Sequence, residues 1–524
     1  MKIIKSTGLG LFIIGILVFT FSAFLGSYNV SPQQFNSYME SRGFKSAWFA
    51  KYMSQDVVAK EFSSSFEISK AIISSLNAAN TKHKEAEQWD RVIWDSPHAL
   101  AFSIIKPAGM GPVAENKGLF LFLTFGLAII GGLMYIIPDV ILLGGPGIKN
   151  NHIYLSNSTN RGWIAYVVFA WLVAFYILLY FYPDFIVSWI YPLDGLSMAL
   201  SGNPASQWFL YGTMYTTVMI VMGIRMYIKY RHNKYQMVRT SSVLFFQFAF
   251  AFTIPELLVR FNMPYMDFKN AWPLDYDFFF DWNLNSLVAN GNLGIFMIVW
   301  GIALTLVLVP VLSYFYGKRW YCSWVCGCGG LAETLGDPYR QHSDKSLKAW
   351  KLERWLIHGV LVFAIVMTGG ALYTYFTGSS SLLGIQTYDL QKYYGFAIGS
   401  VFSGVVGTGF YPVFGNRVWC RFGCPLAAYM GLVQKFKSRF RITTNGGQCI
   451  SCGNCSTYCE QGIDVRWYAQ RGQNIVRSSC VGCGVCAAVC PRGVLKLENG
   501  PNDDATRMEA PAMIIGNEGI KVNA

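Results

Sequence analysis

Apolar runs of membrane-spanning length constrain the fold of this chain more than any other feature. After an N-terminal apolar stretch, similar runs occupy residues 118–138, 163–183, 207–229, 241–261, 293–316, 355–376 and 394–414. A helix needs about 20 apolar residues to cross a bilayer. Only 14% of the residues are charged, whereas a soluble protein carries about a quarter. The sequence therefore predicts an α-helical polytopic membrane protein with about eight spans.

The charges between these runs predict how the spans are oriented. The segment 225–239 contains basic residues and no acid, whereas the loop 262–292 contains four aspartates and Lys269 alone. Basic loops stay on the cytoplasmic side of a membrane. The alternation predicts a cytoplasmic N-terminus and an external position for residues 28–117. It also explains the net charge of +13 without a nucleic-acid partner.

This orientation divides the chain into six predicted regions. Residues 1–27 form a membrane anchor, for which a cleaved signal peptide is the alternative. Residues 28–117 form an external domain with a helix across 69–94. Residues 118–290 hold spans two to five, and residues 291–430 hold spans six to eight. Residues 431–500 form a cytoplasmic domain that starts with a basic, membrane-adjacent stretch, and residues 501–524 form a flexible tail.

Two cysteine runs near the C-terminus give the most specific chemical signal. Residues 449–459 read CISCGNCSTYC and residues 480–491 read CVGCGVCAAVCP, so the pattern C-x2-C-x2-C-x3-C occurs twice. This spacing is typical of bacterial ferredoxins with two [4Fe-4S] clusters, in which the fourth cysteine of each run binds the other cluster. We therefore expect an α+β two-cluster ferredoxin-like domain. The predicted ligands are Cys449, Cys452, Cys455 and Cys490 for cluster 1, and Cys459, Cys480, Cys483 and Cys486 for cluster 2.

Two structural zinc sites are the alternative, because zinc also takes four cysteines. The doubled ferredoxin spacing argues against zinc. The first run departs from the pattern at Glu460, where the second run has Pro491. This departure leaves the ligands intact and would affect only the surroundings of a cluster.

A second pair of cysteine motifs follows two of the apolar runs. Residues 316–327 read YGKRWYCSWVCG and residues 414–425 read FGNRVWCRFGCP. A parallel repeat about an axis along the membrane normal would bring both pairs together at the cytoplasmic surface. The four thiols would then ligate a third metal centre or form redox-active disulfides, and buried structural cysteines are the remaining alternative. The cysteines of this candidate site are Cys322, Cys326, Cys420 and Cys424.

The surroundings of these motifs carry two further expectations. Arg319, Arg417 and Arg421 are expected to favour the thiolate form of the cysteines. Cys328 has no counterpart in the second motif and receives no role.

These motifs carry a resemblance to a known family. Residues 290–500, with paired CxxxC motifs followed by a two-cluster ferredoxin, resemble the NapH/NosR/CcoG group of membrane polyferredoxins. The first motif reads CxxxCG where the family has CxxxCP. The overall layout is similar to NosR, although residues 28–117 lack the flavin-attachment motif of that family, so no flavin is expected. The absence of a further span after the ferredoxin domain counts against a CcoG-like protein. The resemblance implies a bacterial inner membrane and quinol as a diffusible partner.

Few other residues are candidates for chemistry. Glu256 lies within the fifth span and is a candidate for proton transfer during quinol oxidation, although an ion pair with Arg260 is the simpler interpretation. The six histidines form no pair within the spans, and CxxCH and Gly-rich nucleotide motifs are absent. The sequence therefore gives no indication of haem, NAD or ATP binding.

Three functions are compatible with this pattern. In the first, the protein moves electrons between the quinol pool and a partner redox complex, as a quinol dehydrogenase-type oxidoreductase subunit would. In the second, it is an assembly or maturation factor that supplies reductant to a metal centre of a respiratory enzyme. In the third, it is a redox-sensing regulator. Reduction of the clusters by quinol would separate the first function from the second.

Overall fold

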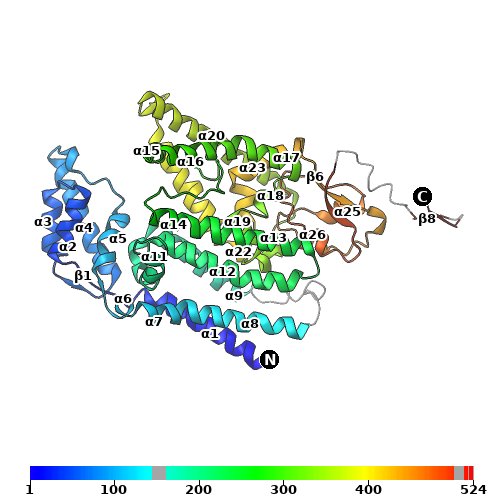
Figure 1. Cartoon of the computed structure of the whole chain (residues 1–524), viewed down its shortest axis with the longest axis horizontal. Helices are drawn as coiled ribbons and strands as arrows, with labels where there is room; N and C mark the ends of the chain where they lie inside the picture. Colours follow the sequence, from blue (N-terminus) through cyan, green and yellow to red (C-terminus); the bar gives the residue numbers. More distant parts are fainter. Residues whose placement is uncertain (144–160, 501–512, 517–518, 523–524) are drawn as a thin grey trace. The chain divides into compact units, whose positions relative to one another are not determined.

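The computed structural model describes residues 1–143, 161–500, 513–516 and 519–522, and the chain divides into two compact units. Unit 1 contains residues 1–142 and 174–217, and unit 2 contains residues 143–173 and 218–524. Figure 1 shows that both units are mainly helical. Among the described residues, seven helices are long and apolar enough to cross a membrane: Lys2–Ser22, Lys117–Pro138, Trp163–Phe181, Gln207–Tyr230, Lys234–Arg260, Gly291–Tyr316 and Leu347–Thr377. The predicted polytopic helical fold is confirmed.

The eighth predicted span, 394–414, is not one continuous apolar helix. Helix α21 (Thr387–Tyr394) continues into the π-helical stretch η11 (Gly395–Val406), and a turn separates η11 from the short helix α22 (Tyr411–Phe414). The sequence between 395 and 409 contains five glycines, which favour a helix less than other residues do except proline. The apolar part of this segment is therefore interrupted before it reaches spanning length.

Unit 1 contains two predicted spans and the compact domain expected at residues 28–117. Helix α4 (Ser65–Glu85) starts at the N-cap Ser64 and covers most of the helix predicted across 69–94. Its residues Ile68, Ile72 and Leu76 are spaced at one helical turn and form the centre of the domain core. A small antiparallel sheet has the strand order β2-β1-β3.

The elements of unit 1 are as follows. They are α1 (Lys2–Ser22), β1 (Ser27–Asn29), α2 (Pro32–Arg42), α3 (Ala47–Asp56), β2 (Glu61–Phe62), α4, α5 (Pro97–Ile105), β3 (Gly109–Met110), α6 (Pro112–Glu115), α7 (Lys117–Leu121), η3 (Phe122–Gly126), α8 (Leu127–Leu143), α10 (Val187–Ile190) and α11 (Asp194–Leu200), with α9 (Trp163–Phe181) and α12 (Gln207–Tyr230) shared between the units.

Unit 2 holds all the cysteines. Its helical part comprises α13 (Lys234–Phe245), η8 (Phe246–Thr253), α14 (Ile254–Arg260), α15 (Asp281–Ala289), α16 (Gly291–Ala303), η9 (Leu304–Leu308), α17 (Val309–Tyr316), α18 (Arg319–Cys322), α19 (Gly327–Glu333), α20 (Leu347–Thr377), the short strands β4 (Ser381–Leu382) and β5 (Ile385–Gln386), α21, η11, α22, η12 (Trp419–Gly423) and α23 (Pro425–Phe436). Helix α23 packs against α17 and α20 (Figure 1).

The C-terminal part of unit 2 has the expected α+β character. Strand β6 (Phe440–Thr444) pairs antiparallel with β7 (Leu495–Asn499), so the two ends of the domain meet in one sheet. The short helices α24 (Asn454–Thr457), α25 (Val465–Gln470) and α26 (Val485–Ala488) lie between these strands in the chain. Most of the predicted tail lies outside the described residues, apart from a hairpin of β8 (Met513–Gly516) and β9 (Gly519–Val522).

The segment 266–280, which the loop charges assigned to an external loop, packs into the helices of unit 2. The indole of Trp300 in α16 donates to the carbonyl of Phe268 at 2.8 Å, and the indole of Trp272 donates to Thr368 Oγ1 in α20 at 2.9 Å. Ala271 is fully buried in the same apolar core as the cysteines of the paired motifs. The loop charges contain no signal for this packing.

Candidate iron–sulfur sites

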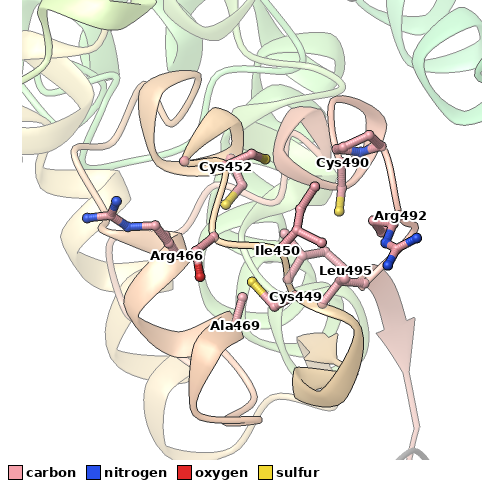
Figure 2. Close-up of a pocket in the computed structure, with 13 residues that line it drawn as sticks. Cys449, Ile450, Cys452, Arg466, Ala469, Cys490, Arg492 and Leu495 are labelled. Atoms are coloured by element: carbon pink, nitrogen blue, oxygen red, sulfur yellow. The ribbon is translucent and has the colours of Figure 1, made fainter.

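The eight ferredoxin-type cysteines line two separate cavities. Site 1 is lined by Cys449, Cys452, Cys455 and Cys490 (Figure 2). Site 2 is lined by Cys459, Cys480, Cys483 and Cys486. Each site therefore takes three cysteines from one run and one from the other, as the spacing predicts.

The backbone around the two sites repeats with the cysteine runs. Gly453 (φ 79°) and Gly484 (φ 73°) are the N-cap residues of α24 and α26, and both adopt a left-handed conformation. Glycine takes this conformation without the strain that a Cβ atom causes. The repeated turn places the second and third cysteines of each run on either side of a helix start.

The paired motifs form similar turns. Gly317 (φ 62°) and Gly415 (φ 93°) both take a left-handed φ, at the ends of α17 and α22. In each motif the second cysteine is the N-cap residue of the next helix, Cys326 for α19 and Cys424 for α23. The backbone N–H of Ala427 donates to Cys424 Sγ at 3.4 Å. Burial, the largest effect, raises the pKa of Cys424 well above its usual value, and the hydrogen bond from Ala427 opposes this only in part.

The four cysteines of these motifs lie in one buried core, which we call the four-cysteine site. Cys322, Cys326, Cys420 and Cys424 are each at most 6% exposed and belong to the same cluster. Burial raises the pKa of Cys322 to about 12, whereas a hydrogen bond from Cys328 lowers the pKa of Cys326 to about 6. Cys328 is therefore a neighbour of the site, although its sequence gave no indication of a role.

Only one of the three motif arginines contacts a thiol. Arg417 is buried, and its Nη1 donates to Cys420 Sγ at 3.6 Å and to the Cys322 carbonyl at 3.3 Å. Arg319 instead stacks on the ring of Phe440, and Arg421 pairs with Glu353. The expectation that all three arginines favour thiolate is therefore wrong for Arg319 and Arg421, whose side chains have other partners.

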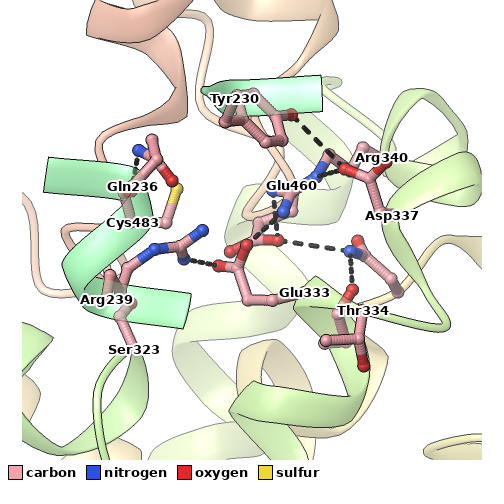
Figure 3. A network of polar contacts seen from close by, with 12 residues as sticks. Tyr230, Gln236, Arg239, Ser323, Glu333, Thr334, Asp337, Arg340, Glu460 and Cys483 are labelled. Atoms are coloured by element: carbon pink, nitrogen blue, oxygen red, sulfur yellow. Dashed lines mark hydrogen bonds and ion pairs between the residues drawn. The ribbon is translucent and has the colours of Figure 1, made fainter. Parts of the chain in front are cut away.

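A buried ion-pair network lies between the four-cysteine site and site 2 (Figure 3). Glu333 pairs with Arg239 at 2.6 Å, with Arg417 at 2.8 Å and also with Arg340. Glu460 pairs with Arg340 at 2.6 Å and with Arg417 at 2.9 Å. Burial acts to raise the pKa of Glu333, but the three guanidinium groups hold this pKa well below its usual range.

The network extends to Asp337, which binds three basic side chains. Lys229 lies at 2.7 Å, Arg340 at 2.7 Å and the partly exposed Arg225 at 2.9 Å from this carboxylate. These groups hold the pKa of Asp337 below its usual range, against the effect of burial.

The charges of this network test whether iron–sulfur clusters fit the adjoining sites. Four buried basic side chains and the partly exposed Arg225 face three buried acidic ones, so the buried groups alone leave a formal excess of one positive charge. Buried charge needs a counter-charge nearby. Arg239 and Arg340 interact electrostatically with the Cys483 thiol of site 2, and Arg417 contacts Cys420. An anionic thiolate-bound cluster at either site would supply the missing negative charge, so the residues fit the group.

The carboxylates of the network do not form a separate metal site. Glu333, Glu460 and Cys483 have ligand atoms within 4.8 Å of one another. Both carboxylates are already paired with arginines, and Cys483 lines site 2. This grouping belongs to the ion-pair network.

The sequence identified the cysteines but missed most of this network. Of the network residues, the sequence analysis singled out Glu460, because the second cysteine run has Pro491 at the equivalent position. Glu333 and Arg340 lie seven residues apart, but Arg239 is distant from both in the chain and is brought to them only by the fold. Glu256 lies half-buried in α14, outside the residues that line sites 1 and 2, so its role stays a prediction.

Comparisons with known protein families match the same cysteine-containing regions of the chain. A family described as a 4Fe-4S binding domain matches residues 298–346 and 395–443, which contain the two paired motifs. A family described as a 4Fe-4S dicluster domain matches residues 441–491. No solved structure matches the chain significantly.

Among curated proteins, the putative electron transport protein YccM of Escherichia coli is 30% identical over 175 residues, which cover 31% of this chain and 46% of YccM. The methylamine utilization ferredoxin-type protein MauN of Paracoccus denitrificans is 29% identical over 161 residues, which cover 30% of this chain and 53% of MauN. The chain thus spans about half the length of these relatives. Over its cysteine-containing part the chain is distantly similar to these ferredoxin-type proteins and to two 4Fe-4S families, and its described residues include seven helices long and apolar enough to cross a membrane.

Proposed function

We propose that this protein moves electrons between the membrane quinol pool and a partner redox complex. Sites 1 and 2 would each hold a [4Fe-4S] cluster, and the four-cysteine site would hold a third iron–sulfur centre. Such clusters supply one-electron transfer at fixed positions. The contribution of the chain is to hold these positions in order and to control the charge and solvent around them.

The observation that carries this proposal is the connection between the four-cysteine site and site 2. Arg417 joins Cys420 Sγ, at 3.6 Å, to Glu460, at 2.9 Å, and Glu460 is the residue that follows Cys459 of site 2. A second connection runs from Ser323, next to Cys322, whose hydroxyl donates to the Val481 carbonyl at 2.7 Å. These buried contacts favour the order four-cysteine site, site 2, site 1.

The segment 266–280 supports a quinol reaction beside the four-cysteine site. Ala271 and Leu274 belong to the core that surrounds the cysteines, and Lys269 interacts electrostatically with Cys326. Burial raises the pKa of both Asp275 and Asp277, and the neighbouring Asp277 carboxyl raises that of Asp275 further. Oxidation of a quinol releases two protons, so this pair joins Glu256 as a candidate acceptor.

The proposed setting follows the loop charges and the family resemblance. The protein would lie in a bacterial inner membrane, with all three sites at the cytoplasmic side and residues 28–117 outside. The NosR- and NapH-like layout is part of this proposal. Lipid, quinol and a partner redox protein are the expected partners, and nucleic acid is not.

The test is reduction of purified full-length protein by menaquinol, followed by electron paramagnetic resonance. We expect menaquinol to produce reduced-cluster signals, and we expect about twelve iron atoms per chain, four for each of three cubane clusters. If a soluble donor reduces the clusters while menaquinol does not, the quinol link is rejected and the maturation-factor function is favoured. An iron content near eight that is unchanged by Cys322→Ser/Cys420→Ser would leave the four-cysteine site as a thiol site.

A further inference from the structure

Site 1 has an exposed cysteine, whereas in site 2 Cys459 and Cys483 are only partly exposed and the four-cysteine site is buried. All thirteen cysteines lie in the described part of the chain, and Cys452 of site 1 is the one that is exposed. Cys480 and Cys486 of site 2 and all members of the four-cysteine site are buried. Electron exchange with a separate protein requires a short approach to a cluster, so site 1 is the point at which a soluble partner can reach this chain.

The exposed charges around site 1 all have the same sign. Within residues 447–500, the exposed charged residues are Arg466, Arg471, Arg492 and Lys496. Glu460 is buried, and Asp464 and Glu498 are half-buried. Arg466 and Arg492 line the cavity of site 1 and flank its cysteines (Figure 2). A partner that approaches this face meets a positive potential.

Two exposed apolar side chains accompany these arginines: Ile450 lines the cavity of site 1, and Trp467 follows Arg466 in α25. Ile450, between two ligands of site 1, is 55% exposed, and Trp467 is 44% exposed. The guanidinium of Arg471 stacks on the Trp467 ring at 3.9 Å and holds it at the surface. Tryptophan and arginine are the side chains that contribute most to protein–protein interfaces. Exposed apolar residues inside a rim of like charge are typical of such a surface.

We propose that Ile450, Cys452, Arg466, Trp467 and Arg492 form the docking face for a soluble, acidic one-electron carrier protein. This inference rests on the proposed electron-transfer function and adds the class of partner and its point of contact. Arginines at the rim attract the acidic surface of the carrier and orient it, and Ile450 and Trp467 pack against its apolar centre. The exposed Cys452 edge of site 1 then lies within the interface.

The experiment measures binding of an acidic flavodoxin, as a probe, to full-length protein in nanodiscs, with salt as a variable. The wild type is expected to bind at low salt and to lose at least about tenfold in affinity between about 20 and 200 mM salt. Arg466→Glu/Arg492→Glu is expected to weaken binding at low salt by at least about tenfold. Cytochrome c, a cationic carrier, is expected not to bind the wild type.

The matched control is Lys348→Glu/Lys351→Glu, which changes the net charge equally at two exposed lysines of α20. This control is expected to change flavodoxin binding by less than about twofold, because the substitutions lie outside the docking face. Iron and sulfide contents of both variants should equal those of the wild type, which verifies that the ferredoxin-type domain is folded. Should the glutamate variant lose iron, Arg466→Gln/Arg492→Gln is the milder substitute, with an expected loss of about threefold.

Equal flavodoxin binding by Arg466→Glu/Arg492→Glu and by the lysine control would overturn the proposal. Wild-type binding whose affinity does not change with salt concentration would also overturn it. Because the readout is binding, its result is separate from the quinol experiment. Failure of menaquinol to reduce the protein would reject the proposed quinol function. Flavodoxin binding that depends on salt and on Arg466 would still identify the docking face in that case.

Discussion

Sites 1 and 2 share one pattern of ligands but have different surroundings. Site 1 has an exposed cysteine and exposed arginines at its rim. Site 2 lies against helix α13 and the buried ion-pair network, where Gln236 donates to the Cys483 carbonyl at 2.8 Å. The repeat in the sequence therefore gives two equivalent sets of cysteines in different surroundings, and in the proposed function site 2 is the internal relay and site 1 the surface contact.

The largest expected difference between the two sites is in quinol-driven reduction. Cys483→Ala removes a ligand of site 2, and Cys452→Ala removes a ligand of site 1. With menaquinol as donor, we expect reduction at site 1 to slow by about a hundredfold or more in Cys483→Ala, because the internal position is lost. Reduction at site 2 should persist in Cys452→Ala. Equal behaviour of the two variants in freeze-quench paramagnetic resonance would contradict the assigned order.

Metal removal should also distinguish the sites. A bulky iron chelator applied with a mild oxidant is expected to extract iron from site 1 at least about tenfold faster than from site 2, because site 1 has an exposed ligand, Cys452, whereas no ligand of site 2 is exposed. Iron released over time, together with the surviving spectroscopic signals, measures this difference. A single release phase for both sites would show that their burial has no effect on stability.

Neutralising one arginine beside each site tests whether a buried charge changes the midpoint potential more than an exposed charge does. Arg239→Gln removes a buried positive charge next to Cys483, and we expect the midpoint potential at site 2 to fall by about 50 mV. Arg466→Gln removes an exposed charge beside site 1, where solvent screens it, and the expected change is below about 10 mV. Potentiometric titration of both variants measures the two shifts in midpoint potential. Equal shifts would contradict the proposed difference in environment between the sites.

The smallest expected difference concerns two glycines with the same backbone conformation. Gly453→Ala and Gly484→Ala both place a Cβ at positive φ, which costs about 1 kcal/mol. At Gly484 the new Cβ would also lie 2.9 Å from the ring of Tyr235, whereas at Gly453 the nearest atom lies at 4.0 Å. We therefore expect Gly484→Ala to lose about 1 kcal/mol more. Thermal unfolding in detergent measures the loss of stability in each variant. Equal losses would mean that the Tyr235 ring moves aside without a measurable cost.

Much of this architecture could be predicted because it depends on short-range patterns. Seven of the eight spans follow from apolar length, and the grouping of cysteines into sites 1 and 2 follows from spacing. The span predicted at 394–414 is not one continuous helix, because η11 ends at Val406 in a glycine-rich turn before α22 begins at Tyr411. Hydropathy averages over a window and does not register such breaks.

The remaining features depend on long-range packing that no local pattern encodes. Glu333 and Arg417 are far apart in the chain and form an ion pair only because the paired motifs converge. The segment 266–280 has the composition of an external loop, and its contacts with Trp300 and Thr368 reveal its position. The contacts of Arg319 with Phe440 and of Arg421 with Glu353 could not be predicted either. In the sequence, nothing distinguishes these arginines from Arg417, because all three lie close to a cysteine.

The most direct test is the order in which the sites become reduced after full-length protein is mixed with menaquinol. Rapid freeze-quenching with paramagnetic resonance should show reduction at site 2 before site 1. In Cys322→Ser/Cys420→Ser neither site should respond to menaquinol, although dithionite should still reduce both. Reduction at site 1 first, or normal reduction by menaquinol in that variant, would contradict the proposed path through the four-cysteine site.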